Sequence, residues 1–127
     1  MAEDFKDFAG YIIKKYKGTK IVEIGMGSDS RVFQELEMKG MRAIATDIEP
    51  RKGAVRDDVT KPDMRIYEGA GLIYALRPPP ELYVFIEDIA RSVGADLIIK
   101  PLSTDPVCRG KLVNYKGTCF YLSNFSF

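Results

Sequence analysis

The fold is decided by residues 20–30, which read KIVEIGMGSDS. Lys20–Ile24 is a short run rich in β-branched residues, which is typical of a buried strand. The six residues that follow contain two glycines and three small polar residues, a composition that ends a strand in a tight turn. Beyond the turn, three apolar residues recur at helical spacing: Val32, Phe33 and Leu36. The segment therefore predicts a strand, a glycine turn and a helix.

The residues that follow complete a unit of two parallel strands. We expect Ser28 or Asp29 to be the N-cap of the helix and Gly40 to end it. Ala43–Asp47 is a second short apolar run and predicts the next strand. Strand, turn, helix and strand in this order form a βαβ unit, whose crossover is almost always right-handed. We therefore expect an α/β fold with a parallel sheet.

Further elements are expected on both sides of this unit. Apolar residues at three- and four-residue steps predict an amphipathic helix over residues 4–17. Short strands are expected at residues 54–59 and 71–76, with a helical turn near residues 62–67 between them. A parallel crossover usually needs about a dozen residues or more. The short connection after Asp47 therefore predicts a crossover helix reduced to a turn.

The last third of the chain predicts a helix, a strand and a hairpin. Pro78–Pro80 would start a helix that Gly94 ends, and its apolar stripe consists of Leu82, Phe85, Ile86, Ile89 and Val93. Ala95–Lys100 is expected as a fifth strand, and residues 101–110 as a loop where a helix would be usual. An antiparallel hairpin should turn at Lys116–Gly117, between the strands Leu112–Tyr115 and Thr118–Leu122.

Composition limits the class of protein. The 127 residues suit a single domain over residues 1–127, and 19 basic against 18 acidic side chains leave a charge of +1, too little to draw nucleic acid or membranes. The absence of histidine excludes Ser-His-Asp and Cys-His catalysis, and with two cysteines it argues against zinc. Residues 1–18 resemble neither a signal nor a transit peptide, so we expect a cytoplasmic protein with Cys108 and Cys119 as free thiols.

The glycine turn is the strongest candidate site. Gly25 and Gly27 would allow a ligand to approach the backbone, and the helix that follows offers free N–H groups. Asp47 comes 20 positions after Gly27, about the separation at which an acid reaches a ribose. Ser30 keeps a dinucleotide such as NAD possible, and two turn glycines with a solvated Asp47 are the structural alternative. Glu23, however, would repel a pyrophosphate and attract a cation such as S-adenosylmethionine, which has an ammonium and a sulfonium group.

Residues 20–60 resemble the cofactor-binding half of class I S-adenosylmethionine-dependent methyltransferases. The resemblance is carried by VEIGMG at residues 22–27, ATDIEP at 45–50 and RDDV at 56–59. It implies a minimal doubly wound, Rossmann-like sheet that is parallel except for the C-terminal hairpin. It also implies a set of cofactor-binding residues: Glu23, Gly25, Met26, Gly27 and Ser28 in the turn, Asp47 at the ribose, Ile48 beside the adenine and Asp58 at its amine. A solvated turn is the alternative for Asp58.

Nearly the whole chain is also similar to a small, functionally uncharacterised archaeal family of short methyltransferase-like proteins. The features that suggest it are VEIGMG, the TDI turn and IYALRPPPEL at residues 73–82. This resemblance implies the fold more than an activity, because one fold supports many functions.

A second candidate site follows the fourth strand, at Arg77, Pro78 and Pro79. Amino-group methyltransferases have an Asp or Asn at the position of Arg77, and an arginine can accept neither a proton nor a hydrogen bond. It can pair with a phosphate or carboxylate, so the substrate or partner on this side is expected to be anionic. The structural alternative is a rigid proline start to the next helix with a solvated Arg77.

Two functions remain open at this point. One is a small methyltransferase of unknown substrate, and the other is a non-catalytic S-adenosylmethionine- or nucleotide-binding module that acts through a partner protein; a NAD-binding domain is third. Basic and aromatic residues in the last 27 positions resemble a single-strand nucleic-acid surface. Aromatic residues of a hairpin more often form its own core, so nucleic acid is not the expected partner.

Overall fold

The computed structural model describes residues 4–49, 53–102 and 109–125, and it contains one seven-stranded sheet in the order β3-β2-β1-β4-β5-β7-β6. Strands β3 to β5 in this order are parallel, and β7 and β6 form an antiparallel hairpin whose strand β7 pairs with β5. The strands are β1 (Lys20–Ile24), β2 (Arg42–Asp47), β3 (Ala54–Arg56), β4 (Ala70–Leu76), β5 (Asp96–Lys100), β6 (Lys111–Tyr115) and β7 (Thr118–Asn124). The expected doubly wound α/β class, parallel with a C-terminal antiparallel hairpin, is confirmed.

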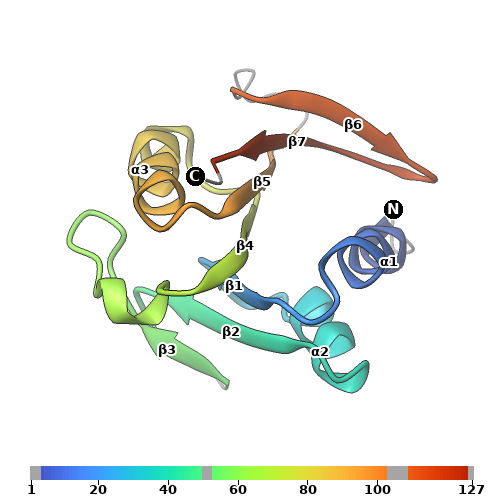
Figure 1. Cartoon of the computed structure of the whole chain (residues 1–127), viewed down its shortest axis with the longest axis horizontal. Coiled ribbons are helices and arrows are strands. Elements are labelled where there is room, and N and C mark those ends of the chain that lie inside the picture. Colours follow the sequence, from blue (N-terminus) through green and yellow to red (C-terminus); the bar gives the residue numbers. More distant parts are fainter. Residues whose placement is uncertain (1–3, 50–52, 103–108, 126–127) are drawn as a thin grey trace.

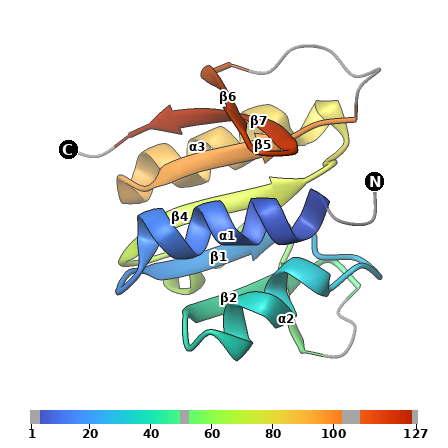
Figure 2. The ribbon, with the colours of Figure 1, turned by 90° about the vertical axis from the view of Figure 1, so that its right-hand side faces the viewer.

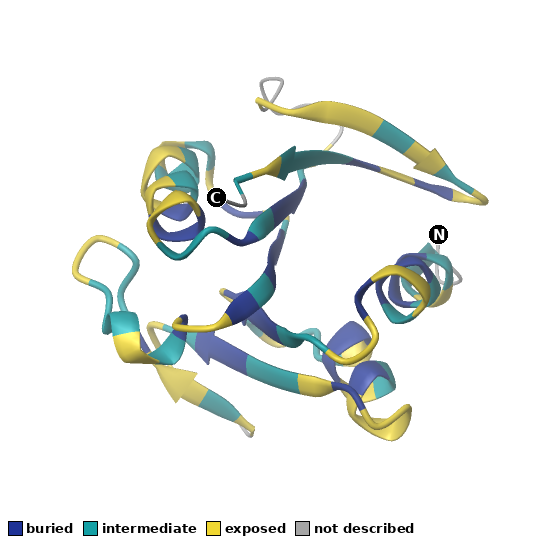
Figure 3. Ribbon diagram, viewed as in Figure 1, coloured by how far each residue is buried: buried dark blue, intermediate teal, exposed yellow. Residues whose placement is uncertain are grey.

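Helices cover both faces of the sheet. α1 (Asp4–Tyr16) and α2 (Arg31–Met38) lie on one face and α3 (Tyr83–Val93) on the other, as Figure 1 and Figure 2 show. The alternation of side chains along each strand divides the apolar residues between two cores. Ile21 of β1 packs under α1, whereas Val22 and Ile24 pack toward α3. Buried residues accordingly line the sheet and the inner faces of the helices (Figure 3).

The connection from β2 to β3 is short, as expected: residues 48–53 separate the two strands, too few for the usual crossover helix. The next connection, from β3 to β4, holds a single 3-10 turn, η1 (Met64–Ile66). Asp57 fastens this turn to the sheet, because its carboxylate accepts hydrogen bonds from the Asp63 amide (2.9 Å) and the Tyr67 hydroxyl (2.5 Å). Both Asp57 and Tyr67 are buried, so a polar contact replaces the apolar face of a helix.

The C-terminal hairpin closes the α1 side of the molecule. Phe120 of β7 is buried, and its ring meets those of Phe8 and Tyr11 of α1 edge-on, at centroid distances of 5.3 and 4.9 Å. Lys116 adopts a φ of 52°, as the tight β6–β7 turn requires. Phe120 is therefore part of the core, as expected for an aromatic residue of this hairpin.

Several local expectations are wrong. The N-cap of α2 is Ser30, one or two residues later than expected, and it makes no side-chain capping bond. The third strand ends at Arg56 because the chain turns into the Asp57 contacts. α3 follows a short 3-10 turn, η2 (Pro80–Leu82). In α3, Phe85 is 36% exposed while Ala90 is buried, because the buried face is formed by Ile86, Ile89 and Ala90 and Phe85 lies beside it.

Some of the remaining expectations concern residues outside the described part of the chain. Most of the loop over residues 101–110, with Cys108, lies outside the described residues, and Cys119 is an exposed free thiol. Within the described ranges, no helix is both long and apolar enough to cross a membrane.

Candidate functional site

The candidate site lies where the central parallel strands end. β1 pairs with β2 on one side and with β4 on the other, so the segments after Ile24, Asp47 and Leu76 emerge at the same edge of the sheet. This is the edge at which open α/β sheets bind ligands. The sequence-predicted residues on all three segments are thus brought together by the order of the strands.

The glycine turn has a backbone that only glycine adopts readily. Gly25 and Gly27 have φ values of 70° and 63°, in the left-handed region that side chains disfavour. A Cβ atom on Gly25 would meet nothing within 4 Å, so the space beside it is open. Two hydrogen bonds tie the turn to β2: the Met26 amide donates to the Thr46 carbonyl (3.0 Å) and the Gly27 amide to Asp47 Oδ2 (2.5 Å).

Asp47 is half-buried and has contacts on both of its oxygens. Oδ2 accepts from the Gly27 amide and Oδ1 from the Glu49 amide at 3.1 Å. A carboxylate offers about four acceptor positions, so each oxygen retains one for a ligand hydroxyl. Ile48, the next residue, is 56% exposed and presents an apolar surface beside this carboxylate.

Glu23 is buried at the end of β1, with 1% of its surface exposed. Tyr74 of the neighbouring strand β4 donates its hydroxyl proton to Glu23 Oε1 at 2.8 Å. Among the described residues, Oε2 has no hydrogen-bond partner although it is buried. The pKa of Glu23 is raised to about 8, chiefly by burial; the Tyr74 bond opposes this rise and the nearby carboxylates of Asp29 and Asp47 add to it.

The other two residues of the turn differ from each other. The Met26 side chain is buried against Phe33 of α2 and Ala45 of β2, so it belongs to the core and only its backbone faces the turn. Ser28 is exposed and lies on the path from the glycines to α2.

Asp58 lies next to the Asp47 segment but is engaged locally. The amide of the preceding residue, Asp57, donates to the Asp47 carbonyl at 3.0 Å, which places this end of β3 beside that of β2. Asp58 Oδ1 accepts from the Thr60 amide (2.9 Å) and hydroxyl (2.8 Å), and these bonds lower the pKa of Asp58. Its half-exposed carboxylate therefore caps a turn through Oδ1. The second oxygen, Oδ2, has no hydrogen bond to a described residue.

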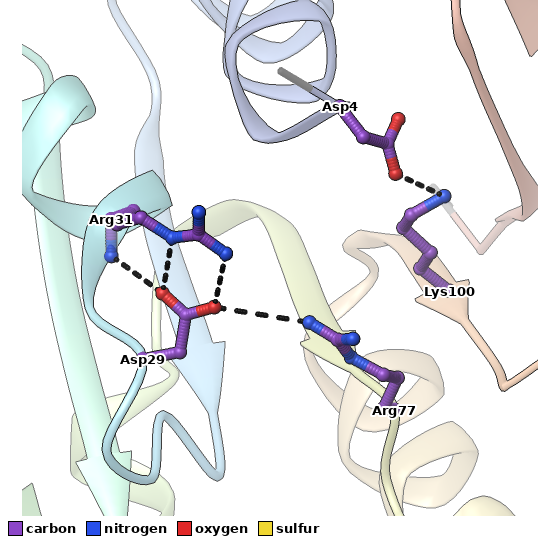
Figure 4. Close-up of polar contacts among 5 residues, drawn as sticks. All are labelled: Asp4, Asp29, Arg31, Arg77 and Lys100. Carbon is purple, nitrogen blue, oxygen red and sulfur yellow. Dashed lines mark hydrogen bonds and ion pairs between the residues drawn. The ribbon is translucent and has the colours of Figure 1, made fainter. Parts of the chain in front are cut away.

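Arg77 follows β4 and reaches toward the glycine turn (Figure 4). Its guanidinium lies 3.8 Å from Asp29 Oδ2, and its side chain is 54% exposed. Asp29 in turn binds Arg31 through both carboxylate oxygens, at 2.9 Å to Nε and 2.8 Å to the terminal nitrogen. These bonds to Arg31 hold the pKa of Asp29 below its usual range. Pro78 is buried and Pro79 is the exposed N-cap of η2.

Sequence reasoning missed two functional candidates, Tyr74 and Asp29. Tyr74 is 51 positions from Glu23, and only the pairing of β1 with β4 brings the two together. The sequence predicts Asp29 only as a helix cap, although its position four residues after Gly25 places it within the turn itself.

Comparison with solved structures supports the architecture. The chain is similar to the antibiotic-resistance methyltransferase Kmr, with a TM-score of 0.59 and 12% identity over 94% of this chain and 92% of Kmr. It is similar to the CcbJ methyltransferase from Streptomyces caelestis, with a TM-score of 0.59 and 14% identity over 94% of this chain and 59% of CcbJ. At such identities the likeness shows a methyltransferase-like Rossmann fold and not an activity.

Comparison of sequences identifies much closer relatives. A UPF0146 protein of Archaeoglobus fulgidus is 48% identical over 119 residues, 90% of each chain. Another of Methanothermobacter thermautotrophicus is 43% identical over 123 residues, 92% of each chain. The family described as "Uncharacterised protein family (UPF0146)" matches residues 5–124. With a methyltransferase-like fold and these archaeal relatives, the chain belongs to the UPF0146 family.

Proposed function

We propose that this protein binds S-adenosylmethionine at the glycine turn. The observation that carries the proposal is the gathering of three carboxylates, Glu23, Asp29 and Asp47, around a glycine backbone at the carboxyl end of β1. The mutual influence of these groups is visible in the raised pKa of Glu23, to which both aspartates contribute. A site lined by these acidic groups favours a cationic ligand, beside which Glu23 would ionise.

The charge of the site distinguishes between the possible cofactors. A dinucleotide would place a pyrophosphate at the glycine turn, where the carboxylates of Asp29 and Asp47 would repel it. S-adenosylmethionine has no phosphate and bears two positive groups. The buried Oε2 of Glu23, which lacks a hydrogen-bond donor among the described residues, is a suitable acceptor for an ammonium group or for a water that contacts it. The residues present therefore fit this cofactor better than NAD.

Each cofactor-binding residue has a distinct part in the proposal. Glu23 would ionise beside the ammonium group and so provide negative charge for it, and the backbone of Gly25–Ser28 lines the approach. Asp47 uses its free acceptor positions for the ribose hydroxyls, with Ile48 beside the base and Asp58 near its amine. When bound, the cofactor would supply an activated methyl group, and this chain would hold it in a fixed orientation.

Methyl transfer is the activity that the fold supports best. Kmr is described as a methyltransferase, and this chain covers 92% of it, so a domain of about this length is compatible with that activity. The alternative is a non-catalytic binding module. It is favoured by Arg77, which stands after β4 where a proton acceptor would be useful and cannot accept a proton.

Calorimetric titration with S-adenosylmethionine, S-adenosylhomocysteine and NAD tests the binding proposal. We expect both adenosyl compounds to bind and NAD to bind more weakly. Asp47→Ala should weaken S-adenosylhomocysteine binding by about tenfold or more, because each hydrogen bond to a charged acceptor contributes about 1.5–3 kcal/mol.

Two further variants distinguish a loss of binding from a loss of structure. Asp47→Asn keeps an acceptor for the Gly27 amide and should fold, yet it should still bind less tightly. Asp88→Ala removes an exposed acid from α3 and should bind as the wild type does. Equal affinity in all four proteins would refute the assignment of Asp47.

A further inference from the structure

The backbone of Arg77 has a left-handed conformation at the point where the chain leaves β4. Its φ is 52°, and the one other non-glycine residue with positive φ among the described residues is Lys116, in the hairpin turn. At Lys116 the two-residue turn explains the conformation. At Arg77 the chain bends after β4 and before Pro78, and the Arg77 amide donates to the Lys100 carbonyl at 2.7 Å. Strained residues of this kind concentrate at functional sites.

The contact of Arg77 with Asp29 is also incomplete. Its distance of 3.8 Å is longer than a hydrogen bond, and Asp29 already binds Arg31 at 2.8–2.9 Å. Among the described residues, Arg77 therefore has no hydrogen-bonded partner for its guanidinium, which is half-exposed. The neighbouring cation, Lys100, is by contrast occupied by Asp4 Oδ2 at 3.1 Å and the Cys119 carbonyl at 2.9 Å (Figure 4).

A second Asp-x-Arg motif in the chain shows what Asp29 and Arg31 do without Arg77. Asp63 binds Arg65 in the same way, through the amide (3.1 Å), Nε (3.0 Å) and a terminal nitrogen (2.9 Å). That motif caps η1 and has no further cation in its salt bridge. The Asp29–Arg31 pair is thus accounted for as the same local contact, in which Asp29 also accepts from the Arg31 amide at 3.2 Å, and Arg77 is an additional group that this contact does not need.

We propose that Arg77 is the anchor for an anionic substrate, a molecule with a carboxylate or phosphate group that binds the free edge of the guanidinium. A planar guanidinium binds such groups through two parallel hydrogen bonds. The order of the strands places Arg77 beside the glycine turn, because β4 adjoins β1 and the Arg77 guanidinium lies 3.8 Å from the glycine-turn residue Asp29. The inference rests on the proposed function in calling the ligand a substrate, but the anion site itself does not.

The acidic groups at this edge have partners of their own, and the outward edge of the Arg77 guanidinium is left for an anionic ligand. The described carboxylates are each engaged: Glu23 with Tyr74, Asp29 with Arg31 and Asp47 with the Gly27 amide. None of them is placed as a free general base. A carboxylate or phosphate is already ionised at neutral pH, so it needs no base to remove a proton.

The test is a titration of the protein with glutarate and with inorganic phosphate, followed by NMR, both without and with saturating S-adenosylhomocysteine. Glutaramide is the uncharged control. Arg77→Gln should weaken binding of the preferred anion by about tenfold or more. Arg77→Lys should bind this anion with intermediate affinity, because lysine cannot form the two parallel hydrogen bonds of a guanidinium. Arg65→Gln, which alters the matched motif, should change nothing.

The Asp29→Asn variant distinguishes an Arg77 that binds an anion from an Arg77 that only stabilises the fold through Asp29. If Asp29 competes with the ligand for Arg77, removal of the Asp29 charge should tighten anion binding. If the contact is only structural, the variant should lose thermal stability with no gain in anion affinity. A preference for glutarate identifies a carboxylate substrate, and a preference for phosphate identifies a phosphorylated one.

The remaining outcomes distinguish the failure of the proposed function from the failure of the Arg77 proposal. Failure of S-adenosylhomocysteine to bind, with Arg77-dependent anion binding intact, refutes the proposed function and leaves the anion site. Binding of S-adenosylhomocysteine with equal anion affinity in the wild type and Arg77→Gln, or with none in either, refutes the Arg77 anchor alone.

Discussion

Glu23 combines two features that are costly for a single residue, an acidic side chain and almost complete burial. One oxygen is satisfied by Tyr74 and the other has no donor among the described residues. The pKa of about 8 means that the folded protein keeps this carboxyl group protonated at neutral pH. A cation bound nearby would favour the ionised form and release the proton. The residue is therefore suited to respond to a charged ligand.

Replacement of Glu23 by Gln should change how stability depends on pH. The unfolded chain loses the Glu23 proton near pH 4.5 and the folded protein near pH 8, so folding takes up a proton between these values. The wild-type free energy of unfolding should therefore fall as pH rises from about 5 to 8, by at most about 1.4 kcal/mol per pH unit from this group. Glu23→Gln should lose less stability over this range. Urea unfolding at several pH values measures the difference, and parallel curves for the two proteins would contradict the raised pKa.

At the scale of the elements, the pairing of β1 with β4 determines the geometry of the site. The register advances from Lys20 opposite Ala70 to Ile21 opposite Leu72, so Gly71 is an extra residue in β4. Such bulges re-aim the residues that follow them. The remaining pairs then bring Tyr74 opposite Glu23, which is the pairing that the buried hydrogen bond requires.

Gly71→Ala should destabilise the protein because of a close contact at this bulge. A Cβ atom would lie 2.9 Å from Thr19 Cβ, and the Thr19 hydroxyl is held by its bond to the Tyr16 carbonyl at 2.7 Å. Overpacking of this kind costs about 1–3 kcal/mol. Gly10→Ala in α1 is the control, since its Cβ would meet nothing within 4 Å and alanine favours a helix by up to about 1 kcal/mol. Thermal unfolding of both variants checks the prediction, which fails if Gly71→Ala is as stable as Gly10→Ala.

At the scale of the whole molecule, the C-terminal hairpin and the first helix stabilise each other. Phe8 stands between Tyr74 of β4 and Phe120 of β7, with ring centroids 5.8 and 5.3 Å away. The amide of Gly117 in the hairpin turn also donates to Asp7 Oδ2 of α1 at 3.1 Å. The two ends of the described chain thus close one core over the central strands (Figure 2).

Phe120→Ala should therefore weaken the entire fold and not only the hairpin. Removal of a fully buried phenylalanine costs about 3–5 kcal/mol, and Phe120 is 1% exposed. We expect a single cooperative unfolding transition at lower denaturant, seen equally by circular dichroism and tyrosine fluorescence. Phe85→Ala, at a residue that is 36% exposed, should cost far less. A separate early transition of the hairpin would show that it is not part of the common core.

The sequence by itself determined those features that depend on neighbouring residues. The glycine turn, the strands on either side of it, the short crossover and the tight turn at Lys116 all follow from local conformational preference and hydrophobic period. Tertiary structure decided the rest, because it depends on which strands become neighbours. The insertion of β7 between β5 and β6 was not evident from the chain. The bond from Tyr74 to Glu23 and the approach of Arg77 to Asp29 join residues about 50 positions apart. No local pattern encodes such contacts, since packing of the whole sheet is what brings their atoms together.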